Sequence, residues 1–169
     1  MLVNGASGAV GTAAVQLAAH AGAGVTGVCG GANRALVESL GARHVIDYTT
    51  EDFTRNGLTY DLIVDTAGTA PYSRSKGSLA EGGRLLLVLA ALPDMLPMAW
   101  LALAGRHRII AGPSAERAED LDALAALAEA GVFRPVIDRC YPFEQIAQAH
   151  RYADSGRKKG SVVVTLAPG

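Results

Sequence analysis

A glycine-rich turn near the N-terminus has residue types and spacing suited to chemistry. The segment Asn4-Gly5-Ala6-Ser7-Gly8-Ala9-Val10-Gly11 joins a short apolar run to an alanine-rich helical pattern. With alanine in the first glycine position, Ala6-x-Gly8-x-x-Gly11 fits the dinucleotide-binding fingerprint. Gly8 would let a pyrophosphate approach the backbone, and Gly11 would let the helix pack closely on the strand. Free N–H groups at the helix start attract phosphates, so the turn predicts a dinucleotide site.

The alternative is a glycine-rich turn that binds no ligand, because a lone fingerprint is a weak signal. Here the turn lies between a predicted strand and an amphipathic helix, and a second strand begins at Val25. This context favours cofactor binding.

The end of the second predicted strand bears on which dinucleotide binds. NAD-binding domains place Asp or Glu there, about 20 residues beyond the turn. No acidic residue occurs between Gly5 and Glu38; the strand ends in Val28-Cys29-Gly30-Gly31, and Arg34 follows. A missing carboxylate removes repulsion against a 2′-phosphate, and an arginine can pair with that phosphate. We therefore expect NADP in preference to NAD; the alternative is that Arg34 is an ordinary solvated residue.

Short β-like runs alternate with helix-like runs along the whole chain. Strands are expected at residues 1–4, 25–29, 44–47, 62–65, 84–89, 108–111, 135–138 and 161–166. Helices are expected at residues 12–21, 33–40, 72–79, 95–104, 118–130 and 143–155, with a helical turn at 52–55. Asn33 is the expected N-cap of the second helix, and Gly41 its stop. Apolar strands separated by helices predict an α/β fold: a doubly wound parallel sheet of Rossmann type in three αβα layers.

Composition bounds the class of protein. The 169 residues suffice for one domain; 50% of them are hydrophobic and 18% charged, as in globular proteins. The formal net charge of -1 argues against a nucleic-acid or anionic-membrane surface. The apolar stretch 85–92 is far shorter than a bilayer span, and no signal peptide is recognisable. Two cysteines give at most one disulfide, so a reduced, cytoplasmic setting is expected.

Other residues capable of chemistry are scattered. Cys29 and Cys140 are far apart and the four histidines have no paired spacing, so we expect no zinc site. Tyr72 and Lys76 have the Tyr-x-x-x-Lys spacing of short-chain dehydrogenases, but they follow the fourth strand, too early for that family's catalytic helix. We interpret this pair as a coincidence. Two acids at strand ends, Asp47 and Asp65, are expected to cap loops rather than to act as acid or base.

Several segments together resemble the quinone oxidoreductase branch of the medium-chain dehydrogenases/reductases, which are similar to zinc-type alcohol dehydrogenases. They are the glycine turn with Ala14-Val15-Gln16-Leu17-Ala18, residues 39–48 (Ser-Leu-Gly-Ala-Arg-His-Val-Ile-Asp-Tyr), residues 60–68 (Tyr-Asp-Leu-Ile-Val-Asp-Thr-Ala-Gly), Gly82-Gly83-Arg84, residues 134–138 and Ala149-His150-Arg151-Tyr152. The resemblance spans nearly the whole chain.

The resemblance implies a set of cofactor-binding residues. Those on the pyrophosphate are Ser7, Gly8, Ala9 and Val10. Those around the adenosine ribose are Gly30, Gly31, Arg34 and Tyr48. Those nearer the nicotinamide are Thr66, Ala67, Leu89, Ala90, Ala111 and Gly112. A basic residue near the end, Lys158 or Lys159, is expected to reach a phosphate.

The resemblance also implies a domain organisation. Residues 1–169 form the dinucleotide-binding domain, with residues 132–169 as the return strands and helix of a catalytic domain whose N-terminal part is missing. A zinc-free, NADPH-dependent reductase of quinones or enones is implied, with no catalytic side chain in this chain. A homodimer is expected through the strand at 108–112, and a separate chain is a possible source of the missing substrate domain.

Two other functions stay open. One is a stand-alone nucleotide-binding or redox-sensing module without turnover, which the missing substrate domain favours. The other is a short-chain dehydrogenase that uses Tyr72 and Lys76.

Overall fold

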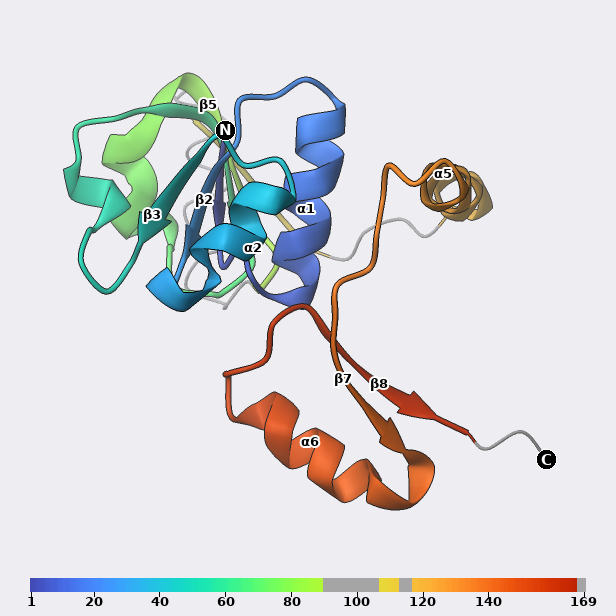
Figure 1. The fold of residues 1–169 in the computed structure, drawn as a ribbon. Coiled ribbons are helices and arrows are strands. Elements are labelled where there is room, and N and C mark those ends of the chain that lie inside the picture. Colours follow the sequence, from blue (N-terminus) through green and yellow to red (C-terminus); the bar gives the residue numbers. More distant parts are fainter. Residues whose placement is uncertain (90–106, 113–116, 167–169) are drawn as a thin grey trace.

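A six-stranded parallel sheet forms the centre of the molecule (Figure 1). The computed structural model describes residues 1–89, 107–112 and 117–166. The sheet comprises β1 (Leu2–Asn4), β2 (Thr26–Cys29), β3 (His44–Asp47), β4 (Tyr60–Asp65), β5 (Leu79–Leu87) and β6 (Arg108–Ala111). Its order is β3-β2-β1-β4-β5-β6, and every pair is parallel. This is the order of a dinucleotide-binding Rossmann sheet, so the predicted fold class is confirmed.

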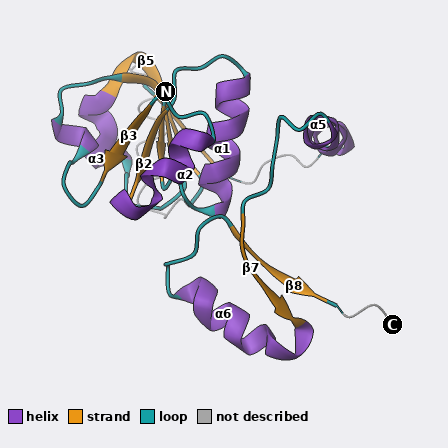
Figure 2. Ribbon diagram, viewed as in Figure 1, coloured by secondary structure: helices purple, strands orange, loops and turns teal. Residues whose placement is uncertain are grey.

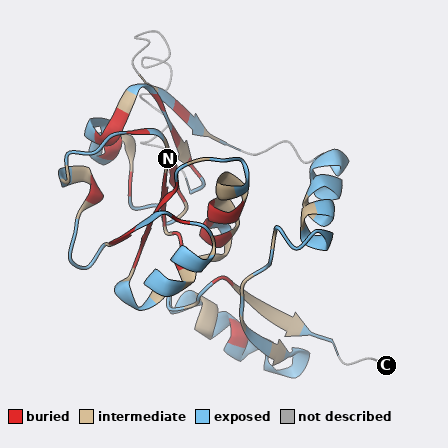
Figure 3. Cartoon of the chain, turned by 45° about the horizontal axis from the view of Figure 1, so that its top comes forward, coloured by how far each residue is buried: buried red, intermediate tan, exposed pale blue. Residues whose placement is uncertain are grey.

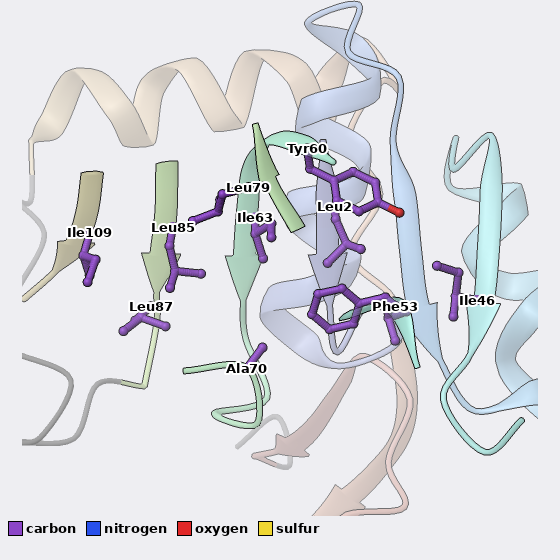
Figure 4. Packing of buried hydrophobic residues seen from close by; sticks show 11 residues of the cluster. Leu2, Ile46, Phe53, Tyr60, Ile63, Ala70, Leu79, Leu85, Leu87 and Ile109 are labelled. Carbon is purple, nitrogen blue, oxygen red and sulfur yellow. The ribbon is translucent and has the colours of Figure 1, made fainter. Parts of the chain in front are cut away.

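Successive residues of the strands belong to two separate hydrophobic clusters, one on each face of the sheet. Leu2 contributes to one cluster, together with Phe53, Ile63 and Leu85 (Figure 4). Val3, the next residue along, contributes to the other cluster, with Val15 of α1 and Val37 of α2. Side chains of successive strand residues point to opposite faces, so a strand covered on both faces must be apolar throughout. This explains why the strands of this sheet are continuous apolar runs.

Helices cover each face in turn. The helices α1 (Ala9–His20) and α2 (Arg34–Ser39), the latter preceded by the 3-10 turn η1 (Gly31–Asn33), lie in front of the sheet in Figure 1. The shorter elements η2 (Phe53–Arg55), α3 (Tyr72–Ser75) and η3 (Lys76–Ser78) follow β3 and β4. Gly41, with φ of +106°, ends the α2 segment as expected.

The helix expected at 72–79 is shorter than predicted. It consists of one α turn and one 3-10 turn, and β5 already begins at Leu79, which pairs with Tyr60. Burial of Leu79 in the core extends the strand backward, across a register shift next to Gly82 and Gly83. The helix expected at 95–104 lies outside the described residues.

The C-terminal part forms a second, smaller unit (Figure 2). β7 (Ile137–Pro142) and β8 (Ser161–Thr165) make a two-stranded parallel sheet, connected by η4 (Phe143–Gln145) and α6 (Ile146–Asp154). The strand expected at 135–138 thus begins two residues later and runs further. The helix α5 (Ala118–Glu129) contains no buried residue in this structure (Figure 3). Among the described residues, none of the helices has the length and hydropathy needed to cross a bilayer.

Candidate functional site

The carboxyl ends of β2, β1 and β4 meet at one edge of the sheet. Chain order reverses between β1 and β4, and open α/β sheets bind ligands at such a switch point. The glycine turn leaves β1 at this edge. Gly5, with φ of +81°, and Ala6 donate their amides to the carbonyl of Val28, at 3.1 and 2.9 Å. The turn is therefore fixed against the end of β2.

Gly8 and Gly11 differ in what surrounds them. A β-carbon at Gly11 would overlap the carbonyl oxygen of Gly5 and lie 2.8 Å from the α-carbon of Ala6, so α1 packs too closely there for any side chain. A β-carbon at Gly8 would meet only that same oxygen, at 3.4 Å, and Gly8 has extended backbone angles that any residue adopts. The fold thus requires glycine at position 11. Position 8 has room for a side chain, but that side chain would lie at the cleft.

A buried hydrogen-bond network fixes the loop after β4 beside the turn. The Oδ1 of Asp65 accepts from the Asn4 side chain at 2.8 Å and from the amides of Ala67 and Gly68, both at 3.1 Å. Its Oδ2 accepts from the amide of Ala70 at 2.8 Å. Asp65 therefore caps a loop, as expected, and has no geometry for acid–base work.

A cleft of about 540 Å³ lies over the turn. It brings together nine of the predicted cofactor residues: Ser7, Gly8, Ala9, Val10, Gly30, Tyr48, Thr66, Ala67 and Lys158. Six further lining residues are Gly5, Ala32, Asn33, Gly156, Arg157 and Lys159, the last being the predicted alternative to Lys158, and none of the described residues that line the cleft is acidic. Three basic side chains beside the start of α1 give the cleft an anion-binding character.

The basic wall of the cleft comes from the far end of the chain. The amide of Gly160 donates to the carbonyl of Ser7 at 2.8 Å, and Gly160 and Gly8 form an isolated parallel bridge. The ammonium of Lys158 donates to the Gly160 carbonyl at 2.9 Å, so one of its protons is already engaged. Arg157 was not predicted, because only a contact distant in sequence brings it to the turn. The one available signal was the run of three basic residues.

Asn33 is a second residue that the sequence did not assign to the site. Its side chain makes no N-cap hydrogen bond, contrary to the expectation. Instead its side-chain amide donates to the hydroxyl of Ser7 at 3.2 Å, and its buried Oδ1 has no hydrogen-bond partner among the described residues. Asn33 thus links the loop after β2 to the glycine turn.

A second cavity, of about 610 Å³, shares Gly5, Tyr48 and Ala67 with the cleft. It extends past the end of β3 to Phe53 and to the ion pair of Asp52 with Arg74, 3.2 Å long. Hydrogen bonds from Thr54, and then from Arg74, lower the pKa of Asp52, so its carboxylate is charged at neutral pH. The remaining lining residues are Asn4, Val28, Glu51 and Thr69. Sequence reasoning did not predict this extension.

Other predicted site residues lie outside the cleft. Gly31 adjoins its lining residues, and Arg34 forms an ion pair with Glu38 at 3.7 Å. Leu89 lies beside the loop after β4, 3.5 Å from where a β-carbon of Gly68 would be. Ala111 ends β6, two strands away from β4, and Gly112 follows it. Ala90 is outside the described residues.

Tyr72 and Lys76 are not part of the cleft. The hydroxyl of Tyr72 lies 3.1 Å from the Nδ1 of His107, and Tyr72 packs against the core cluster that contains Leu2 and Ile63. Lys76 is exposed. Both residues therefore lie outside the cleft, and their interpretation as a coincidence of spacing stays a prediction. In the described parts of the chain, no three His, Cys, Asp or Glu side chains cluster as metal ligands would.

Comparison with known proteins assigns the family. Residues 40–164 match the zinc-binding dehydrogenase family. The chain belongs to this family. The chloroplast envelope quinone oxidoreductase homolog of Arabidopsis thaliana is 31% identical over 97% of the chain and 51% of that protein. The mouse mitochondrial NAD(P)H oxidoreductase RTN4IP1 is also 31% identical, over 98% of the chain and 47% of that protein.

A solved structure agrees with this assignment. The quinone oxidoreductase from Coxiella burnetii superposes with a TM-score of 0.86 at 26% identity, over 96% of the chain and 51% of that protein. The resemblance to quinone oxidoreductases in this family is thus confirmed. The chain spans about half the length of the curated relatives that it matches.

Proposed function

We propose that this zinc-binding dehydrogenase family chain binds NADPH in the cleft over its glycine turn, as the coenzyme part of a zinc-free oxidoreductase of quinones or enones. The observation that carries the proposal is the composition of the cleft. The start of α1 and three basic residues, Arg157, Lys158 and Lys159, line it together, and none of its described lining residues is acidic. Such a site favours a ligand with several phosphate charges.

The shape of the site supports one orientation of the cofactor. The pyrophosphate would lie on the backbone of Gly8, Ala9 and Val10. The adenosine would extend over Gly30 and Tyr48 into the second cavity, and the nicotinamide toward Thr66 and Leu89. Bound nicotinamide would supply the hydride, and these residues bind and orient it.

We also propose a substrate domain and a dimer interface for the whole enzyme. Relatives about twice as long carry oxidoreductase names, so we infer that residues 132–169 belong to a substrate domain whose other part lies outside this sequence. We propose a homodimer through β6, the strand at one end of the described sheet. Cytoplasmic localisation stays a prediction, and several relatives are mitochondrial or chloroplast proteins.

The proposal is tested by measuring binding and turnover separately. Calorimetry should give tighter binding of NADPH than of NADH, and equal affinities would reject the NADPH preference. Oxidation of bound NADPH by a panel of quinones and enals supports the oxidoreductase. Binding without oxidation would favour the nucleotide-binding or redox-sensing module. Loss of activity in Tyr72→Phe would favour a short-chain dehydrogenase mechanism.

A further inference from the structure

An acidic residue lies against the loop that follows β2, although no acidic residue ends β2 itself. Asp47 is the last residue of β3, and the parallel register pairs it with Cys29, the last residue of β2. In NAD-binding domains, an acid at the end of the second strand binds the ribose hydroxyls. The neighbouring strand therefore supplies a carboxylate at the level where that acid would stand.

The carboxylate of Asp47 is held in place by its surroundings. Its Oδ1 accepts from the Thr49 amide at 3.0 Å and from the Thr49 hydroxyl at 2.7 Å. A β-carbon at Gly31 would overlap its Oδ2 and lie 3.3 Å from its Cγ, so this oxygen lies against the Gly31 backbone. Hydrogen bonds from Thr49, and then from the Gly31 amide, lower the pKa of Asp47. Asp47 is therefore charged at neutral pH.

Arg34, the first residue of α2, lies among acidic side chains. Arg34 pairs with Glu38 at 3.7 Å, and it lies close enough to Asp47 to contribute to the lowered pKa of that carboxyl. A 2′-phosphate beside this loop would be attracted by one positive charge and repelled by two negative charges. A ribose 2′-hydroxyl carries no net charge, so these charges would affect it much less than a phosphate.

We propose that Asp47 is a specificity-determining residue of the cofactor site. Its negative charge beside Arg34 limits how strongly the site prefers a 2′-phosphate over a 2′-hydroxyl. The same carboxylate positions the loop after β2 by holding the backbone of Gly31. This inference rests on the proposed function, since it needs a dinucleotide in the cleft.

The test is the ratio of NADPH to NADH affinity in Asp47→Asn, measured by calorimetry. This change keeps the size of the side chain and removes its charge. Relief of repulsion should tighten NADPH binding about three- to tenfold at low salt, with little change for NADH, and the gain should shrink as salt is added. Asp61→Asn, at the amino end of β4, is the matched control and should leave the ratio unchanged. Thermal unfolding checks that both variants fold.

A second variant tests the positioning role without removing the charge. Gly31→Ala adds a β-carbon that displaces the Asp47 carboxylate, and it should weaken both cofactors at least about twofold. In the Asp47→Ala background, the same change should cost nothing further. Gly24→Ala is the control, because a β-carbon there would meet no atom within 4 Å.

The outcomes separate this inference from the proposed function. If the wild-type chain binds neither dinucleotide, both the proposed function and the proposed role of Asp47 are wrong. If it binds them and Asp47→Asn leaves the NADPH to NADH ratio unchanged, only the role of Asp47 is overturned. Equal weakening of both cofactors by Asp47→Asn would overturn the specificity-determining role, because positioning of the loop alone would give that result.

Discussion

At the residue scale, the two glycines of the fingerprint do different work, and substitution separates them. Gly8→Val puts a side chain at the cleft without backbone strain, so it should weaken NADPH binding by more than about 100-fold, or about 2.7 kcal/mol, while leaving the thermal unfolding midpoint in place. Gly11→Ala should instead destabilise the fold by about 1–3 kcal/mol, because its β-carbon overlaps Gly5. Unchanged NADPH affinity in Gly8→Val would show that the cleft is not the site.

Arg34 provides the second residue-scale prediction. Its side chain is 48% exposed and free to turn from Glu38 toward a phosphate. Arg34→Ala should weaken NADPH binding by about 1–3 kcal/mol, the range for a lost charge-assisted contact, and should hardly change NADH binding. Calorimetry with both cofactors checks this. An equal loss for the two would mean that Arg34 supports the loop and does not read the 2′-phosphate.

At the element scale, one side chain of α1 fastens the C-terminal unit to the sheet. Gln16 is buried; its amide donates to the Arg134 carbonyl at 3.1 Å, and its Oε1 accepts from the Arg134 amide at 2.9 Å. Gln16→Ala should lower the free energy of unfolding by about 1–2 kcal/mol and should also weaken NADPH binding, because the basic wall is less firmly held. Urea unfolding measures the first effect. A loss no larger than that of exposed Gln148→Ala would contradict this role.

The sheet could be predicted from the sequence, whereas the contacts between distant elements could not. The strands β3 and β6 have the predicted bounds, because a strand buried on both faces must be an apolar run. The end of α3 was missed, since pairing of Leu79 with Tyr60 overrides local helix propensity. Arg157 was not predicted because its position beside the glycine turn depends on a backbone hydrogen bond between Gly160 and Ser7, which are far apart in the sequence. The sequence predicts Asp47 as a loop cap. Its contact with Gly31 depends on the register between β2 and β3, which the sequence pattern alone does not specify.

At the scale of the whole molecule, the strand β6 presents an unpaired edge within the described sheet. It pairs with β5 alone, and Ile110 is 43% exposed whereas Ile109 is buried. An open edge with apolar flanks favours pairing with a second copy. We expect a dimer in light scattering that Ile110→Pro dissociates, with far-UV circular dichroism checking the fold. A monodisperse monomer at high micromolar concentration would refute the dimer.

The central claim is that one cofactor contacts both the glycine turn and the C-terminal basic segment. Titration of NADPH into the ¹⁵N-labelled chain, followed by amide NMR, tests it most directly. We expect saturable shifts at Gly8, Gly30, Tyr48 and the segment 156–160, and none around Asp61 at the amino end of the sheet. An absence of chemical-shift changes at the turn, or changes confined to the amino end of the sheet, would contradict this claim.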